Sequence, residues 1–105
     1  MNKVIRDGKV AVLYSPGYGA GWYSWRQGGT KDEAMLFHHE LVAAVESGDK
    51  LSTERTAARL FPDQYLGGVA QLTIAWVPQG TQFSIDEYDG NESLSYRDSD
   101  HWVTA

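Results

Sequence analysis

Two Asp-Gly dipeptides, Asp7-Gly8 and Asp89-Gly90, each stand between runs of residues that favour β-strands. A two-residue Asp-Gly loop forms a type I′ turn, since both central residues take positive φ, and the turn decides which residues face each other across the hairpin. At the second turn this register pairs Ile85 with Leu94, so the turn and the apolar pattern agree. The sequence therefore predicts two antiparallel hairpins.

Between the hairpins the apolar residues recur with a helical period. The stripe from residue 32 onward consists of Ala34, Phe37, Leu41 and Val45. Gly48 is expected to end this helix, and Ser52 to cap a second helix over residues 52–60. After residue 68 the period changes to two, which is typical of strands. The order predicts a single α+β domain over residues 1–105, with an antiparallel sheet built from hairpins and two helices packed on one face.

The composition narrows the class of protein. The chain has 105 residues, 42 % of them hydrophobic, and no cysteine, which excludes disulfides, cysteine-based zinc sites and thiol nucleophiles. The first residues are charged and lack an apolar signal core, and no apolar run approaches the length of a membrane span. We therefore expect a cytoplasmic protein without membrane association.

Charge is distributed unevenly along the chain. Residues 1–31 carry a balance of +4, residues 32–59 carry −3 and residues 60–105 carry −6, which gives the net charge of −5. A net acidic chain is repelled by nucleic acid, so we expect no direct nucleic-acid binding. The first turn also places Arg6 opposite Lys9. Because hairpin ends are well solvated, we expect water to screen these like charges, and a nearby anion is the alternative.

The segment over residues 14–25 concentrates aromatic side chains among glycines. It departs from the dinucleotide-binding fingerprint, because Trp22 stands where the last glycine should be and no helix follows directly. Glycine N–H groups can still bind an anion, and exposed rings can stack on a base. The candidate ligand- or partner-binding residues are Tyr18, Trp22, Tyr23, Trp25 and Arg26. The alternative is that these rings pack into the core.

Four carboxylates surround the second Asp-Gly turn and form the predicted acidic partner surface. They are Asp86, Glu87, Asp89 and Glu92. The register places Glu87 opposite Glu92, and such a pair can share a proton or hold a hard cation. The spacing of an EF-hand is not met, and acidic residues at a hairpin end usually protect an exposed edge. The sequence therefore favours a surface over a catalytic or metal site.

The residues His38-His39-Glu40 only partly match the zinc-binding pattern H-E-x-x-H. Ala43 occupies the position of the required second histidine, so no helical metal pair exists. We expect His38 to be packed beside the apolar stripe and His39 to be solvated. No nucleophile motif is complete either. The prediction is a protein that is not an enzyme and has no cofactor and no metal.

Three blocks of the sequence, residues 7–22, 65–68 and 76–90, together resemble a family of small proteins encoded by phages, prophages and mobile elements. The first block reads DGKVAVLYSPGYGAGW and the last WVPQGTQFSIDEYDG. The resemblance carries over no catalytic residue. It implies a phage-type protein in the host cytoplasm, and such proteins include inhibitors of host defence, anti-CRISPR proteins among them, and sponges for nucleotide signals.

Two functions follow as hypotheses. The first is a non-enzymatic binding protein that occupies the surface of a partner protein, such as a CRISPR nuclease, and acts as an anti-CRISPR inhibitor with its acidic hairpin toward a basic groove. The alternative is a nucleotide- or small-anion-binding protein, a signal sponge, that uses the loop over residues 17–26. Either function is compatible with a homo-oligomer.

Overall fold

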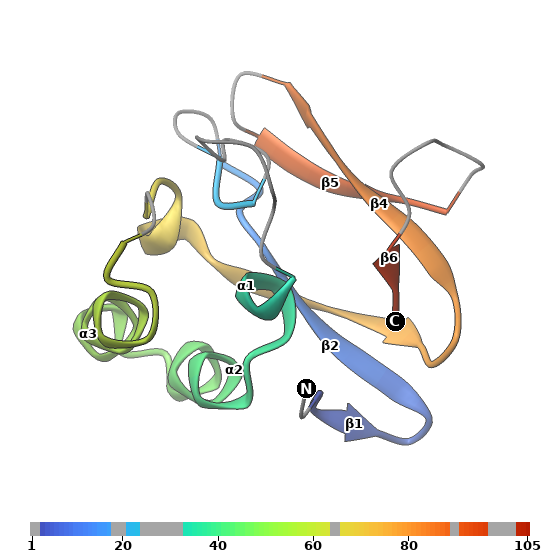
Figure 1. Ribbon diagram of the computed structural model, residues 1–105, viewed down its shortest axis with the longest axis horizontal. Coiled ribbons are helices and arrows are strands. Elements are labelled where there is room, and N and C mark those ends of the chain that lie inside the picture. The colour runs from blue at the N-terminus through green and yellow to red at the C-terminus, as the bar shows by residue number, and fades with distance from the viewer. Residues whose placement is uncertain (1–2, 18–20, 24–32, 64–65, 89–90, 97–102) are drawn as a thin grey trace.

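The computed structural model describes residues 3–17, 21–23, 33–63, 66–88, 91–96 and 103–105 (Figure 1). The elements in chain order are β1 (Ile5–Arg6), β2 (Lys9–Tyr14), α1 (Ala34–Phe37), α2 (His39–Ser47), α3 (Lys50–Leu60), the 3-10 helix η1 (Val69–Gln71), β3 (Thr73–Pro78), β4 (Gln82–Tyr88), β5 (Asn91–Ser95) and β6 (Val103–Thr104). This is the predicted α+β fold with antiparallel strands.

The strands form two sheets where the sequence predicted one. One sheet has the order β1-β2-β3 and the other β5-β4-β6. The reason lies in the turn after β3, where backbone groups of Gly80 and Thr81 form hydrogen bonds with Ala105. Gly80 N–H donates to the carbonyl of Ala105 at 2.8 Å, and Ala105 N–H donates to the carbonyl of Thr81 at 2.9 Å. As a result β4 pairs with the C-terminal strand β6 and with β5, and β3 pairs with β2.

Both hairpin registers agree with the prediction. Asp7 and Gly8 have φ values of 50° and 75°, as a type I′ turn requires, and Arg6 pairs with Lys9. In the second hairpin β4 and β5 pair Ile85 with Leu94 and Glu87 with Glu92. The Asp89-Gly90 turn itself lies outside the described residues.

The helices differ from the prediction at two points. The single helix expected from residue 32 is interrupted at His38, whose ψ of 122° is not helical and whose Nδ1 accepts a hydrogen bond from Glu40 N–H at 3.2 Å. His38 thus ends α1 and caps α2, a role that the apolar stripe does not reveal. The second helix begins two residues early, since Asp49 rather than Ser52 is its cap. Gly48 ends α2 with a φ of 76°, as predicted.

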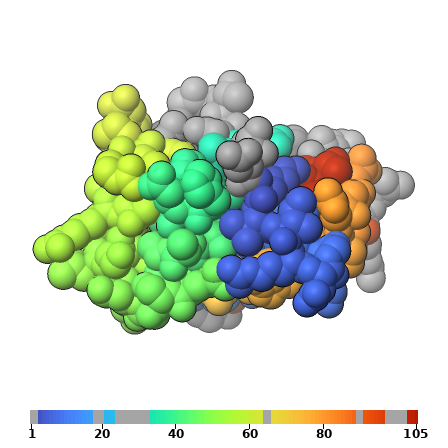
Figure 2. Space-filling view, turned by 90° about the horizontal axis from the view of Figure 1, so that it is seen from below, coloured from blue at the N-terminus to red at the C-terminus, as the bar shows by residue number. Residues whose placement is uncertain are grey.

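The core forms around β2, whose residues Val10, Ala11, Val12 and Leu13 are all fully buried. Side chains alternate along a strand, so both faces of β2 are covered. Phe37 of α1 meets Phe83 of β4 edge to face, with 6.2 Å between ring centroids, and so joins the helices to the second sheet. Figure 2 shows the β1–β2 hairpin in blue beside the helices in green. The two sheets and the helices therefore share one apolar core.

Candidate functional site

Two of the aromatic residues proposed as binding groups are buried, which corrects that prediction. Trp22 is 0 % and Tyr23 is 5 % exposed. The Trp22 Nε1–H donates to the carbonyl of Met35 at 2.8 Å, and the Trp22 ring meets Phe61 edge to face. Buried rings have no exposed face on which a ligand could stack. In the core they bury a large apolar area, which stabilises the fold. Tyr18, Trp25 and Arg26 lie outside the described residues.

Glu92 corrects the prediction of an acidic partner surface, since it is 1 % exposed. Its Oε1 accepts hydrogen bonds from Ser15 N–H at 3.0 Å and from the Ser15 hydroxyl at 3.2 Å. Its Oε2 accepts a hydrogen bond from Tyr23 N–H at 2.8 Å. A carboxylate is costly to bury unless donors replace water, and these donors do so. Glu92 is therefore a structural residue of the interior.

Ser15 completes this arrangement. Its carbonyl accepts from Glu92 N–H at 2.8 Å, and its hydroxyl oxygen accepts from Trp22 N–H at 3.0 Å. The segment that leaves β2 is thus bound to β5 at Ser15, and Trp22 and Tyr23 are held beside it. We call Ser15, Trp22, Tyr23 and Glu92 the Glu92 cluster. Its hydrogen bonds keep the end of the hairpin β4–β5 attached to the core.

One sequence signal could have identified Glu92. The predicted register places Glu92 opposite Glu87 and, two residues before Leu94, on the same face of the hairpin as Ile85 and Leu94. A charged residue in register with an apolar face is a candidate for burial with dedicated donors. Which donors it meets depends on Ser15 and Tyr23, which no local pattern connects to β5.

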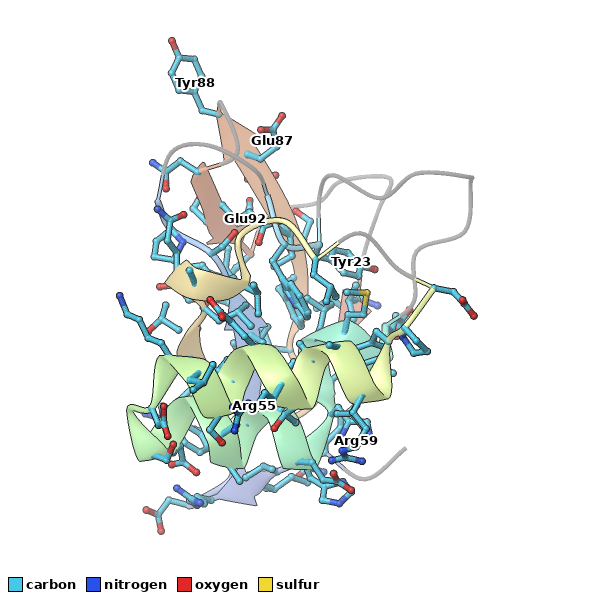
Figure 3. The ribbon with its side chains drawn as sticks, turned by 90° about the vertical axis from the view of Figure 1, so that its left-hand side faces the viewer. Tyr23, Arg55, Arg59, Glu87, Tyr88 and Glu92 are labelled. Atoms are coloured by element: carbon cyan, nitrogen blue, oxygen red, sulfur yellow. The ribbon has the colours of Figure 1, made fainter. Side chains whose placement is uncertain are left out.

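The outer end of β4 carries the exposed part of the predicted acidic surface. Asp86, Glu87 and Tyr88 are all exposed, and the Tyr88 side chain is 72 % exposed. We call these three residues the acidic tip. Figure 3 shows Glu87 and Tyr88 at the end of the hairpin that points away from α3, with Glu92 further inside. Asp89 lies outside the described residues.

Within the described residues, α2 forms ion pairs with β1 and with α3. The guanidinium of Arg6 donates to both carboxylate oxygens of Glu46, at 2.5 Å and 2.9 Å, and this pairing raises the pKa of Arg6. The sequence predicted that water screens the like charges of Arg6 and Lys9. In the structure the Glu46 carboxylate of α2 binds Arg6, which is the alternative of a nearby anion. Arg59 of α3 pairs with Glu40 of α2, and the hydrogen bond lowers the pKa of that carboxyl. Both pairs lie on the surface.

The two neighbouring histidines behave as their positions predict. His38 is half-buried and His39 is exposed, and their rings stack with 4.9 Å between centroids. Burial lowers the pKa of His38, and the neighbouring His39 lowers it further. Among the described residues, no three histidine, cysteine or acidic side chains come together to hold a metal ion. Within the same residues, no helix has the length and the apolar character to cross a bilayer.

Comparisons with protein-family models, with curated proteins and with solved structures found no match for this chain. The resemblance to small phage proteins therefore stays a prediction from the residues quoted for it.

Proposed function

We propose that this chain is a binding protein that docks its acidic tip, Asp86, Glu87 and Tyr88, on a basic surface of another protein. The observation that carries the proposal is the exposed Tyr88 ring beside two exposed carboxylates. Tyrosine is enriched in protein interfaces, because a large rigid ring buries much area for little loss of side-chain freedom. The carboxylates of Asp86 and Glu87, which precede Tyr88 in β4, supply the charge that recognises a basic partner.

The attachment of the hairpin supports this proposal. The acidic tip lies at the end of β4, which pairs with β5 from Ser84 to Tyr88, and β5 is bound to the core through Glu92 and Ser15. A surface held in place before binding loses less conformational entropy when the complex forms. The Glu92 cluster therefore acts indirectly, by keeping the tip in one position.

The chemistry of the tip favours a particular class of partner. Proteins that bind nucleic acid carry grooves rich in lysine and arginine, and a carboxylate-rich surface competes with phosphates for them. The balance of −6 over residues 60–105 strengthens that attraction. Together with the resemblance to phage proteins, this leads us to propose an inhibitor of a host-defence nuclease, such as one of a CRISPR system.

The experiment is a binding titration against a purified CRISPR nuclease, with and without its guide RNA, over a range of salt concentrations. The test variant is Asp86→Lys/Glu87→Lys. The control variant, Glu54→Lys/Asp63→Lys, makes the same change in net charge at exposed positions in and just after α3. We expect binding to weaken with salt, and the test variant to lose at least about tenfold in affinity while the control keeps most of it.

A Tyr88→Ala variant separates the ring from the charges. If the tip is the interface, this variant loses affinity without changing the salt dependence, because the ring carries no charge. An affinity that does not change with salt concentration, or that falls equally in the test and control variants, contradicts the proposed surface. Failure to bind the nuclease at all contradicts the proposed partner class.

A further inference from the structure

The outer face of α3 carries four hydrogen-bond donors in one row. They are Ser52, Arg55, Thr56 and Arg59. The spacing of i, i+3, i+4 and i+7 places them within an arc of about 100° on the helix. All four line an open cleft of about 370 Å³, together with Asp49 and Leu51. Figure 3 shows Arg55 and Arg59 projecting from the same side of α3.

Three of these donors have no partner among the described residues. Within the part of the chain that the structure describes, neither the Arg55 guanidinium nor the hydroxyls of Ser52 and Thr56 form a hydrogen bond or an ion pair. Arg59 is paired with Glu40 of the neighbouring helix, which fixes the direction of its guanidinium. The row therefore combines one oriented cation with a second cation and two hydroxyls that remain available.

The charge of the cleft favours an anion. Its lining holds two arginines and one carboxylate, that of Asp49. The Asp49 Oδ1 already accepts from Leu51 N–H at 3.1 Å and from Ser52 N–H at 3.3 Å, so this carboxylate is engaged with the positive end of the helix dipole. Glu40 offsets much of the charge of Arg59, so Arg55, which has no carboxylate partner among the described residues, supplies most of the positive field toward solvent.

We infer that this cleft binds a small phosphate monoester. Guanidinium groups bind phosphate oxygens through paired hydrogen bonds, and hydroxyls add further donors. The volume is that of a small-molecule site, and Leu51, 54 % exposed at the cleft, offers an apolar contact to the organic part of the ligand. A nucleic acid is disfavoured, since its many phosphates meet a chain of net charge −5.

The experiment uses the full chain and two probes, inorganic phosphate and phenyl phosphate, titrated by NMR or calorimetry. We expect Arg55→Gln/Arg59→Gln to weaken phenyl phosphate binding by at least about tenfold. The control, Arg6→Gln/Lys9→Gln, removes the same charge from the first hairpin and keeps the affinity within about twofold. Leu51→Ala is expected to lower the affinity for phenyl phosphate toward that for inorganic phosphate, because it removes only the apolar contact.

A second variant covers the case in which loss of both arginines prevents folding. Ser52→Ala/Thr56→Val keeps every charge, and we expect a loss of affinity of about threefold or more from the missing donors. Equal affinities for all variants would overturn the site. A phosphoserine peptide that binds more tightly than phenyl phosphate would overturn the assignment to a small molecule. These variants leave the acidic tip unchanged, so their outcome is independent of the proposed docking function.

Discussion

Glu87 and Glu92 are the same residue type and face each other across β4 and β5, yet they lie in opposite environments. Glu87 is exposed at the acidic tip, and Glu92 is 1 % exposed beneath the segment that follows β2. The two residues have equivalent positions in the hairpin, because both side chains lie on the same face. The difference lies in the surroundings of Glu92, to which Ser15 and Tyr23 donate hydrogen bonds.

This contrast shows what makes a buried carboxylate acceptable. Glu92 accepts hydrogen bonds from two backbone N–H groups and one hydroxyl, from residues that lie 77 and 69 positions away in the chain. Those donors gain partners that they would otherwise lack in the interior. The same charge that suits the tip for a partner protein thus holds three distant segments together in the core.

The largest effect is expected from Glu92→Ala compared with Glu87→Ala. Removing the Glu92 carboxylate leaves buried donors without an acceptor, and we expect a loss of about 3–5 kcal/mol in the free energy of unfolding. Glu87→Ala changes an exposed residue, and its expected loss is about 1 kcal/mol or less. Urea denaturation followed by fluorescence measures both.

Glu92→Gln serves as the shape-matched control. It keeps one acceptor oxygen but turns an NH₂ group toward the remaining donors, so its stability should fall between those of the parent protein and Glu92→Ala. Similar losses for Glu87→Ala and Glu92→Ala would break the comparison, because they would mean that burial does not distinguish the two carboxylates.

A moderate effect is expected at His38, which lies between the buried and exposed regions. Its pKa is lowered in the folded protein, chiefly by burial and then by His39 and Arg59, while Glu40 opposes the shift. The folded state therefore binds fewer protons than the unfolded state as pH falls below about 6.5, the ordinary value for histidine. Stability should be full above that pH and should decline below it, in thermal melts across the acidic range.

His38→Asn tests the assignment of that pH dependence. The asparagine oxygen can still accept from Glu40 N–H and cap α2, but it does not titrate. The variant should keep the stability of the parent protein near neutral pH and lose the part of the decline due to His38. An unchanged pH profile would show that His38 is not the group responsible.

The smallest effect is expected for Glu46→Gln, which breaks the surface pair with Arg6 and leaves Arg6 over the Trp76 ring. Exposed ion pairs contribute little to stability and are screened by salt. We expect a small lowering of the melting temperature at low salt that disappears at high salt. A large, salt-independent loss would mean that this pair behaves like the Glu92 cluster, and would remove the distinction between the two regions.

Local features of the sequence determined several elements of the structure. Asp7-Gly8 requires positive φ at both residues, Gly48 accepts the left-handed conformation that ends a helix, and alternation aligns Ile85 with Leu94. Each depends on a few neighbouring residues, so the α+β class and both hairpin registers could be read from the chain. The exposure of Asp86 and Glu87 was also predictable.

The interior arrangement was decided only by the tertiary structure. The separation into two sheets depends on the C-terminal Ala105 meeting Gly80 and Thr81, and the helix break at His38 on a cap that no period predicts. The sequence left Trp22 and Tyr23 open between a binding surface and the core, and it placed Glu92 on the surface, because aromatic residues suit an interface as well as a core and acidic residues are mostly exposed. Their burial depends on contacts between segments far apart in the chain, and local periodicity does not encode which distant donor will reach which acceptor.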